Sequence, residues 1–292
     1  MAAITIGVPV YNEAARLAGC LERLRAQTFP DFEVLIFDNA STDATGEIAQ
    51  AFCARDPRFG YVRQPVNRGA IGNFNDVLRA AQSPYFIWRA ADDSADLDYL
   101  EVLHGLLEAD PSKQLAVGRI VGTFRGEVER TTRFPKLKGD GGLSDRWRLM
   151  FGASPSWVYG LYRREALIPI LDRIVHDYGD DTWAWDFLLM LPFFMDAAVT
   201  GTNATNFEAA LRPRRGEPGQ KPPPRTEPDL DGRLALRRRF LAIAQSFVDE
   251  RIAPGPGRAL WAGLLWRYAD RRVYKTRHIL RRSARRLIGL KP

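Results

Sequence analysis

Two adjacent carboxylates, Asp92 and Asp93, follow the apolar run "YFIW" closely. Carboxylate oxygens are the hard ligands that Mg²⁺ and Mn²⁺ prefer, and phosphate oxygens complete such sites. Two neighbouring carboxylates buried without a cation would be costly, because each disfavours the charge of the other. The pair therefore indicates a divalent-metal site that binds a phosphorylated ligand. The alternative is a helix cap with a neighbouring acid.

Two further polar clusters follow apolar runs earlier in the chain. Tyr11–Glu13 come after "ITIGVPV", and residues 38–43 come at the end of "FEVLIFDNASTD". In open α/β sheets, ligands bind beyond the carboxyl ends of the strands, so the three clusters would lie at one edge. The chain has neither G-x-G-x-x-G after its first strand nor a Walker lysine loop. A nucleotide would instead be held by stacking, carboxylates and a metal.

The elements that must position these clusters alternate along the first hundred residues. The apolar patterns predict strands over residues 3–10, 32–39, 59–65 and 84–93, and helices over 14–27, from about 43, and over 73–82. Such alternation predicts a parallel sheet covered by helices on both faces. Residues 115–142 are expected to add strands and a loop, and the remainder of the chain is mainly helical.

Composition places the chain among globular proteins, with 292 residues, 46% hydrophobic and 26% charged. Its apolar runs are too short for a membrane span, and the N-terminal residues lack the pattern of a signal peptide. Cys20 and Cys53 suggest neither zinc nor a disulfide framework, so we expect a cytoplasmic protein.

Charge divides the chain into an acidic body and a basic C-terminal part. Residues 1–210 hold 21 Lys and Arg against 28 Asp and Glu, whereas residues 211–292 hold 21 against 7. From Arg271 to Lys291 there are basic residues and no acid, with apolar residues near heptad spacing. This pattern indicates a basic amphipathic helix, which lies either on an anionic membrane surface or on the body of the protein.

The long stretch "VPVYNEAARLAGCLERLRAQTFPDFEVLIFDNASTDATGEIAQAF" resembles the opening of the family 2 glycosyltransferases. The resemblance continues through "NRGAIGNFNDVLRAA" and "YFIWRAADDSADLDYL", and more weakly to "RPRRGEPGQ". It implies an α/β GT-A (Rossmann-like) fold, with a mostly parallel sheet flanked by helices. It also implies inverting transfer of a sugar from a nucleotide-sugar, most simply a UDP-sugar, to a glycan or lipid-linked acceptor.

Three segments are expected on this basis. A GT-A catalytic domain would span residues 1–211, a flexible loop or linker rich in Pro and Gly would span 212–233, and a helical basic extension would span 234–292. The extension is the segment that would meet a membrane, placing the enzyme at its cytoplasmic face.

The resemblance also assigns residues to the nucleotide. Pro9 and Tyr11 would begin the loop that receives the base, with the Tyr11 ring stacked on it. Glu13 would hold the start of the helix or contact the ribose, and a first-turn carboxylate favoured by the helix dipole is the alternative. Asp38 would accept the imide N–H of uracil. Arg68 would meet phosphate or ribose, unless it is simply solvated.

The same resemblance makes the carboxylate pair a DXD-type site for Mn²⁺ or Mg²⁺. Asp92 would contact the ribose or the metal, and Asp93 would bind the metal that bridges the diphosphate. In "YGDDT", Asp181 would be the general base that takes the proton of the acceptor hydroxyl. Asp180 would position or cap, and Asp186 is a more distant candidate for the base.

One departure from the family pattern concerns Glu217. It stands in "EPGQ", where the family often has a histidine, which leaves open whether it binds the metal. Trp157 precedes "YGLY" and would either stack on an acceptor sugar or belong to the core.

Two other functions remain open at this point. The basic tail would suit a nucleic-acid-binding protein, although the carboxylate clusters argue against nucleic acid on the first domain. A catalytically inactive nucleotide-sugar-binding scaffold is the other, and the complete set of acidic residues argues against it.

Overall fold

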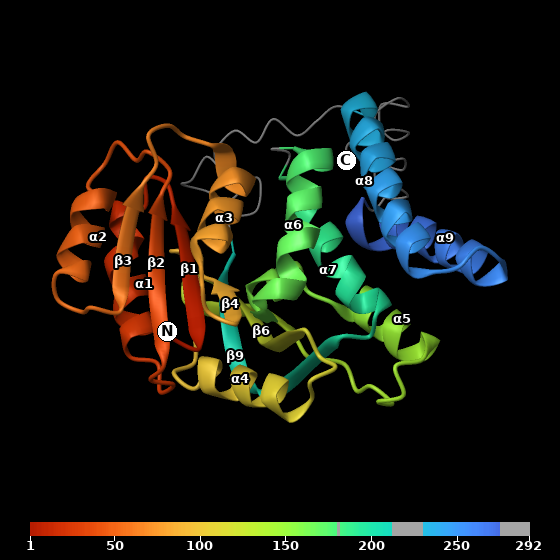
Figure 1. Ribbon diagram of the computed structural model, residues 1–292, viewed down its shortest axis with the longest axis horizontal. Helices are drawn as coiled ribbons and strands as arrows, with labels where there is room; N and C mark the ends of the chain where they lie inside the picture. Colours follow the sequence, from red (N-terminus) through yellow and green to blue (C-terminus); the bar gives the residue numbers. More distant parts are fainter. Residues whose placement is uncertain (180–181, 212–229, 275–292) are drawn as a thin grey trace.

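The N-terminal half forms the expected alternation of strands and helices (Figure 1). A computed structural model of the protein describes residues 1–179, 182–211 and 230–274. The first elements are β1 (Ile4–Val10), α1 (Ala14–Arg25), β2 (Phe32–Asp38), α2 (Thr45–Cys53), β3 (Phe59–Arg63), α3 (Gly69–Ala80) and β4 (Tyr85–Trp88). The four strands pair in parallel in the order β3-β2-β1-β4, so their carboxyl ends share one edge.

Strand β1 lies between β2 and β4 and is buried on both faces. Ile4, Ile6 and Val8 on one face and Thr5 on the other have no exposed surface. Gly7 is required by close packing, since a Cβ there would lie 2.6 Å from the Phe86 ring. Pro9 is tolerated because the pairing of β1 with β4 ends at Gly7, so no ladder hydrogen bond to β4 is lost at the proline.

The second half of the sheet is mixed rather than parallel. It contains β5 (Ser94–Ala95), α4 (Tyr99–Ala109), β6 (Leu115–Phe124), β7 (Glu127–Thr132), α5 (Leu143–Gly152), the 3₁₀ helix η1 (Pro155–Tyr159), β8 (Leu161–Arg163), α6 (Arg164–Tyr178), α7 (Trp185–Met195) and β9 (Val199–Ala210). Strand β8 lies antiparallel between β4 and β6, and β9 runs parallel to β6 and antiparallel to β5. The nine strands form one sheet. Parallel pairing thus continues in the second half between β6 and β9 only, and the described sheet as a whole is mixed.

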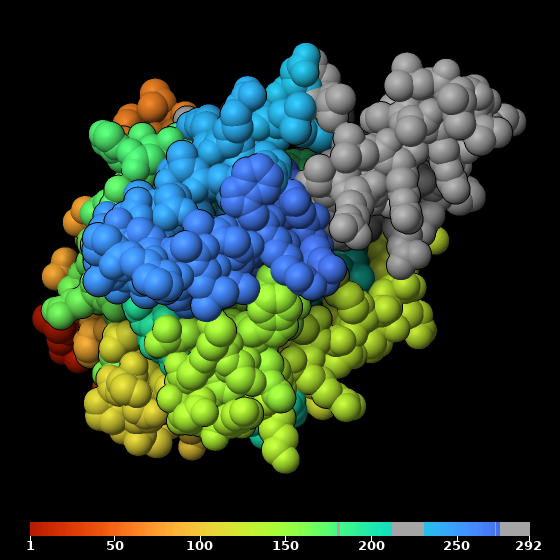
Figure 2. Space-filling view, turned by 90° about the vertical axis from the view of Figure 1, so that its right-hand side faces the viewer, coloured from red at the N-terminus to blue at the C-terminus, as the bar shows by residue number. Residues whose placement is uncertain are grey.

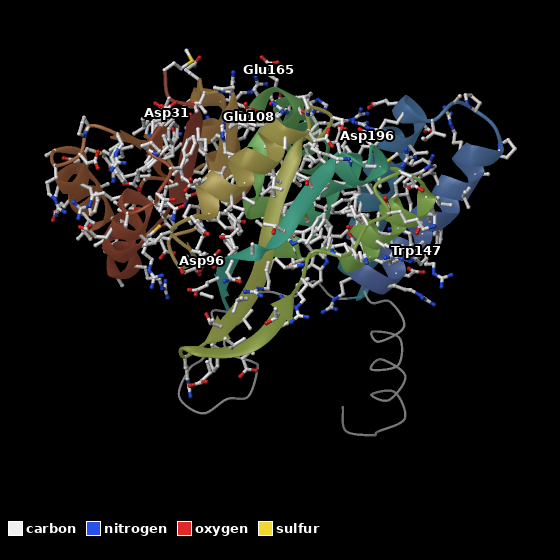
Figure 3. All side chains as sticks on the ribbon, turned by 90° about the horizontal axis from the view of Figure 1, so that it is seen from below. Asp31, Asp96, Glu108, Trp147, Glu165 and Asp196 are labelled. Atoms are coloured by element: carbon white, nitrogen blue, oxygen red, sulfur yellow. The ribbon has the colours of Figure 1, made fainter. Side chains whose placement is uncertain are left out.

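Strands β6 and β7 form an arm that extends away from the body of the molecule (Figure 3). Strand β9 pairs with β6 of this arm and with β5, which follows the turn after β4. Asp96 accepts hydrogen bonds from both the backbone N–H and the side-chain amide of Asn206, at 2.9 and 2.7 Å. These bonds hold the short strand β5 against β9.

The fourth strand is shorter than the sequence predicts. Its last ladder bond is donated by the Arg89 N–H to the Gly7 carbonyl at 2.8 Å, and the chain then turns. Asp92 and Asp93 therefore lie in a turn between β4 and β5 and not at the end of a strand. Pairing of β4 with β1 ends at Trp88 and Gly7, although β1 continues beside β2 to Val10.

The C-terminal elements are α8 (Leu230–Arg251), α9 (Pro256–Tyr268) and the π-helical turn η2 (Ala269–Val273). Helix α8 begins inside the predicted linker of residues 212–233, with Asp231 in its first turn, where a carboxylate favours helix initiation. Residues 212–229 and 275–292, with most of the predicted amphipathic helix, lie outside the described residues.

The C-terminal helices pack on the body, forming one face together with α5 (Figure 2). Phe240, Phe247 and Tyr268 are buried, and the Tyr268 ring meets those of Phe151 and Phe187 edge-on. The described part of the extension is therefore joined to the body of the protein through a shared core.

Candidate active site

The loops that follow β1 and β2 are hydrogen-bonded to each other. The Asn12 N–H donates to Ser41 Oγ at 2.9 Å, and Asn12 Oδ1 accepts from the Thr42 N–H at 2.8 Å. Asn12 has a φ of 54°, in the left-handed region that asparagine tolerates. These two hydrogen bonds hold the loop that bears Tyr11, whose side chain is 46% exposed at the edge of the sheet. Sequence analysis missed the role of Asn12.

Glu13 occupies the N-cap position of α1, but its carboxylate accepts no capping hydrogen bond from the helix. The carboxylate forms an ion pair with Arg16 at 3.0 Å. Capping is instead supplied from the second loop, where Asp43 accepts hydrogen bonds from the N–H groups of Ala14 and Thr45. The bonds to Asp43 hold its carboxyl pKa below the usual range, the side-chain bond from Thr45 being the largest cause. The Glu13 carboxylate therefore lies at the start of α1 and pairs with Arg16 without capping the helix.

Asp38 ends β2 as predicted, and its carboxylate is fully buried. Oδ1 accepts from the Ser41 N–H at 2.8 Å. Oδ2 accepts from the Tyr61 hydroxyl at 2.7 Å and from Arg63 Nη1 at 3.0 Å. Arg63, at the end of β3, was not singled out from the sequence.

Arg68 lies at the start of α3, beside the same two loops. Its N–H donates to Asn39 Oδ1 at 2.7 Å, and its guanidinium pairs with Asp76 at 2.8 Å. The amide of Asn39 also donates to Asn67 Oδ1 and to the Gly69 carbonyl. Asn39 therefore ties the β2 loop to the start of α3. The Arg68 side chain remains 54% exposed, within reach of an anionic ligand at this edge.

Asp92 and Asp93 line a cavity of about 280 Å³ on the α1 side of the sheet edge. Asp92 is exposed, and Asp93 is half-buried. Asp93 Oδ1 accepts the Ala210 N–H of β9 at 2.9 Å. The other residues lining the cavity are Arg16, Gly19, Cys20, Arg23, Ala91, Ser94, Thr123, Glu208 and Ala210.

Two carboxylates suit a divalent ion whose remaining ligands come from the substrate. Within residues 1–179, 182–211 and 230–274, no group of three His, Cys, Asp or Glu residues is arranged to hold a metal. Mg²⁺ is commonly bound by one or two carboxylates together with substrate phosphates and water. The donor set of Asp92 and Asp93 fits that mode and does not fit a closed all-protein site.

A buried arginine lies behind this pair. Arg89 is 2% exposed, and its guanidinium lies 4.8 Å from the centre of the Phe207 ring and 5.5 Å from that of Tyr99. In the described part of the chain, its Nε and Nη1 atoms have no hydrogen-bond partner. A void of about 10 Å³ is lined by Arg89 and Asp93, space for about one water. Arg89 thus places positive charge close to Asp93, in a residue that sequence analysis overlooked.

Asp186 lies in the first turn of α7 and is half-buried. Burial raises the pKa of its carboxyl to about 6, although Oδ1 accepts the Phe187 N–H at 2.9 Å. Its charge also raises the pKa of Tyr159, as do the charges of Asp93 and Asp92 after the larger effect of burial. Asp186 therefore belongs to the same electrostatic neighbourhood as the carboxylate pair.

Asp180, Asp181 and Glu217 lie outside the described residues. Pro9 is half-buried in β1, opposite Phe37 of β2. Trp157 has no exposed surface and packs against Phe134 and Phe194. Its ring offers no face to a sugar, so the expectation of an acceptor-stacking role is corrected to a core role.

Comparison with known proteins identifies the family of the chain. The sequence model of the family described as "Glycosyl transferase family 2" matches residues 5–171, more than half of the chain. The chain is 36% identical over 101 residues to "Glycosyltransferase GlyA" of Streptococcus pneumoniae, covering 35% of this chain and 14% of GlyA. It thus spans a small part of that relative.

Solved structures of two other proteins share the fold of this chain. Staphylococcus aureus TarS (residues 1–349, in complex with UDP) superposes with a TM-score of 0.69 at 15% identity, covering 99% of this chain and 75% of the TarS chain. The mannosyltransferase PcManGT of Pyrobaculum calidifontis, in complex with GDP-Man and Mn²⁺, gives a TM-score of 0.50 at 19% identity, covering 94% and 82%. The expected GT-A fold is confirmed, and the chain belongs to glycosyl transferase family 2.

Proposed function

We propose that the protein is an inverting glycosyltransferase that moves a sugar from a UDP-sugar to a hydroxyl of a glycan or lipid-linked acceptor. The observation that carries the proposal is the convergence of the three polar clusters at one edge of the sheet. Tyr11 directly follows Val10, which pairs with buried Asp38, and the loops after β1 and β2 are hydrogen-bonded to each other. The carboxylate pair lines a cavity beside α1. That TarS binds UDP supports the choice of uracil as the base.

In this proposal the nucleotide lies across the carboxyl ends of β1, β2 and β4. The exposed ring of Tyr11 stacks on the base, and the loop with Pro9 and Glu13 borders the ribose. Arg68 meets an oxygen of the ribose or phosphate. Base–aromatic stacking contributes about 1–3 kcal/mol, enough to make Tyr11 a main determinant of nucleotide affinity.

Asp93 and Asp92 would hold Mn²⁺ or Mg²⁺ against the diphosphate. When bound, the ion offsets the negative charge that develops on the departing nucleoside diphosphate. The bond from the Ala210 N–H fixes one oxygen of Asp93, which orients the carboxylate before any ligand arrives. PcManGT, which shares the fold, was solved with Mn²⁺.

Transfer then needs a base on the acceptor side. The acceptor hydroxyl oxygen attacks the anomeric carbon, its proton passes to a carboxylate, and the bond from that carbon to the diphosphate oxygen breaks. We propose Asp181 as this base, with Asp180 in a positioning role. Asp186 is a second candidate, because burial keeps its pKa close to the range in which a base works well.

The function is tested by thermal unfolding of the full chain with UDP, GDP, dTDP and a short DNA duplex, each with Mn²⁺ and with EDTA. We expect UDP with Mn²⁺ to raise the melting temperature most. Stabilisation by the DNA duplex alone would favour the nucleic-acid alternative. Nucleotide binding without turnover of any UDP-sugar over a panel of glycan and lipid-linked acceptors would favour the inactive scaffold.

The outward side of α9 is suited to an anionic membrane surface. Leu260 is 49% exposed and Trp266 is 58% exposed, and the Arg237 guanidinium lies 4.3 Å from the centre of the Trp266 ring. Exposed Arg267 and Arg271 flank them. Exposed Trp and Leu beside arginines are typical of interfacial helices. The described helices include none that is both long and apolar enough to cross a membrane.

Replacing both Leu260 and Trp266 by Ser is expected to weaken binding to vesicles containing anionic lipid by roughly tenfold or more, since full burial of a large apolar side chain contributes about 1.5–3 kcal/mol. Co-sedimentation with such vesicles measures the effect. Leu97→Ser, which alters a 51% exposed leucine before α4, is the matched control. Equal binding by all three proteins would remove α9 from membrane contact.

A further inference from the structure

The carboxylate of Asp38 is largely occupied by groups of the protein. It accepts hydrogen bonds from the Ser41 N–H, the Tyr61 hydroxyl and Arg63 Nη1, and the residue has no exposed surface. A carboxylate has about four acceptor sites, so at most one remains, and it lies under cover. A base approaching from solvent would have to displace these groups to reach Asp38.

Arg63 forms the outer layer of the same arrangement. Nη1 donates to Asp38 Oδ2 at 3.0 Å and Nη2 donates to the Ser41 carbonyl at 2.8 Å, which fixes the guanidinium plane against the β2 loop. The side chain is nevertheless 51% exposed. A guanidinium carries five N–H donors, so Arg63 retains donors for a ligand.

The loop bearing Tyr11 meets the same turn. Val10 pairs with Asp38 in the sheet, and the Asn12 N–H donates to Ser41 Oγ, the residue whose carbonyl binds Arg63. Tyr11 lies between Val10 and Asn12 in the chain. Arg63 and Tyr11 therefore border one stretch of the surface, with Asp38 beneath it.

We propose that Arg63 recognises the base by donating a hydrogen bond to a carbonyl oxygen, O4 of uracil, and that Asp38 is the positioning residue that holds Arg63. The proposal rests on the proposed function, in which the Tyr11 loop receives a nucleotide. Sequence resemblance gave the base contact to Asp38 itself. Here the buried carboxylate supplies charge and geometry, and the arginine supplies the donor.

The chemistry predicts which bases are accepted. Uracil presents a carbonyl oxygen at position 4, whereas cytosine presents an amino group there, which would face the guanidinium as donor against donor. A desolvated donor left without an acceptor costs free energy, so the pocket should reject cytosine. The arrangement also explains why the charge of Asp38 is tolerated in the interior, because a buried carboxylate requires a cationic or hydrogen-bonding partner.

The test compares Kd values for UDP, CDP and 4-thio-UDP in the presence of Mn²⁺, measured by calorimetry on the full chain. Sulfur at position 4 weakens the acceptor but leaves the imide N–H in place. The variants are Arg63→Met and Arg63→Lys. The double variant Asp38→Asn/Arg63→Met removes both charges together. If loss of Arg63 alone unfolds the protein, the comparison of UDP with 4-thio-UDP on the wild type decides between Arg63 and Asp38. Arg55→Met is the control, an arginine 57% exposed and paired with Glu22.

We expect the wild type to prefer UDP over both CDP and 4-thio-UDP. Arg63→Met, and the double variant, should bind UDP about 10–100-fold more weakly and bind all three ligands within a few-fold of one another. Arg63→Lys should retain part of the preference, and Arg55→Met all of it.

Two results would overturn the assignment of Arg63. One is an undiminished preference for UDP over CDP in Arg63→Met or the double variant. The other is equal binding of UDP and 4-thio-UDP by the wild type, which would return the imide contact to Asp38. If the wild type binds UDP and neither of these two results is found, both proposals are upheld. Failure of the wild type to bind any nucleotide with Mn²⁺ would reject the proposed function, and the role of Arg63 with it.

Discussion

Asp181→Asn is expected to lower the rate of sugar transfer by about 10²–10⁴ while leaving the Kd of UDP with Mn²⁺ nearly unchanged. Asparagine keeps the size of the side chain and much of its hydrogen bonding but cannot take a proton. The base acts on the acceptor and not on the diphosphate, so the loss should fall on turnover. Initial rates with the true acceptor, together with calorimetry for UDP, measure the two quantities separately.

The neighbouring carboxylates provide the controls. Asp180→Asn should change the rate little, because that residue is assigned to positioning. An inactive Asp180→Asn beside an active Asp181→Asn would place the base one residue earlier. If both variants transfer sugar normally, the base is neither of them, and Asp186→Asn is the decisive variant.

The pH dependence of the rate separates Asp181 from Asp186. Only a deprotonated carboxylate accepts the proton, so kcat/KM rises as the pH rises through the pKa of the base in the free enzyme and then levels off. Burial raises the pKa of Asp186 to about 6. If Asp186 were the base, the rate would fall below about pH 6, and Asp186→Asn would remove that limb together with the activity. An unaltered limb in this variant would exclude Asp186.

Asp93→Asn is expected to abolish the Mn²⁺-dependent part of UDP binding as well as turnover. In the wild type, UDP at a hundred times its Kd should stabilise the fold by about 2.7 kcal/mol, and only with a divalent cation present. The neutral amide is a much weaker ligand for a hard cation than a carboxylate. Thermal unfolding with UDP and either Mn²⁺ or EDTA measures the difference.

The control is Asp31→Asn, which removes an exposed carboxylate just before β2, at the opposite edge of the sheet. It should respond to UDP and Mn²⁺ as the wild type does. Equal stabilisation of the wild type in Mn²⁺ and in EDTA would show that the site does not use a metal. A normal metal response in Asp93→Asn would move the metal site elsewhere.

The fold was predictable where a local pattern decides the structure. The apolar run from Ile4 to Val10, followed by leucines at helical spacing in α1, indicates a strand and a helix without reference to the remainder of the chain. Strands β8 and β9 were not predicted. Strand β8 has three residues, and β9 is rich in Thr, Asn and Ala, so each depends on pairing with β6. Local sequence carries little information about such pairing.

The site was predictable as a set of acidic and aromatic residues following strands. Tyr11 and Asp38 lie where the sequence places them, and Asp92 and Asp93 share their edge of the sheet. Arg63 and Arg89 were not predicted, because an arginine in a polar segment is usually solvated. Only the tertiary structure shows that Arg63 covers Asp38 and that Arg89 is buried between Phe207 and Tyr99. In "WRAADD", a cation directly after a buried strand was the one signal available for Arg89.

The pairing of β5 with β9 has a consequence for the order in which the protein is made. Asp93 is held by the N–H of Ala210, and Ser94 Oγ donates to Glu208 at 2.6 Å, so the turn with the carboxylate pair is held by residues more than a hundred positions later. A growing chain emerges N-terminus first, and contacts so distant in sequence form late. The ribosome thus releases the acidic motif long before the strand that gives it shape. We therefore expect a stage in synthesis at which the loops after β1 and β2 can fold while the turn with Asp92 and Asp93 still lacks its partner β9.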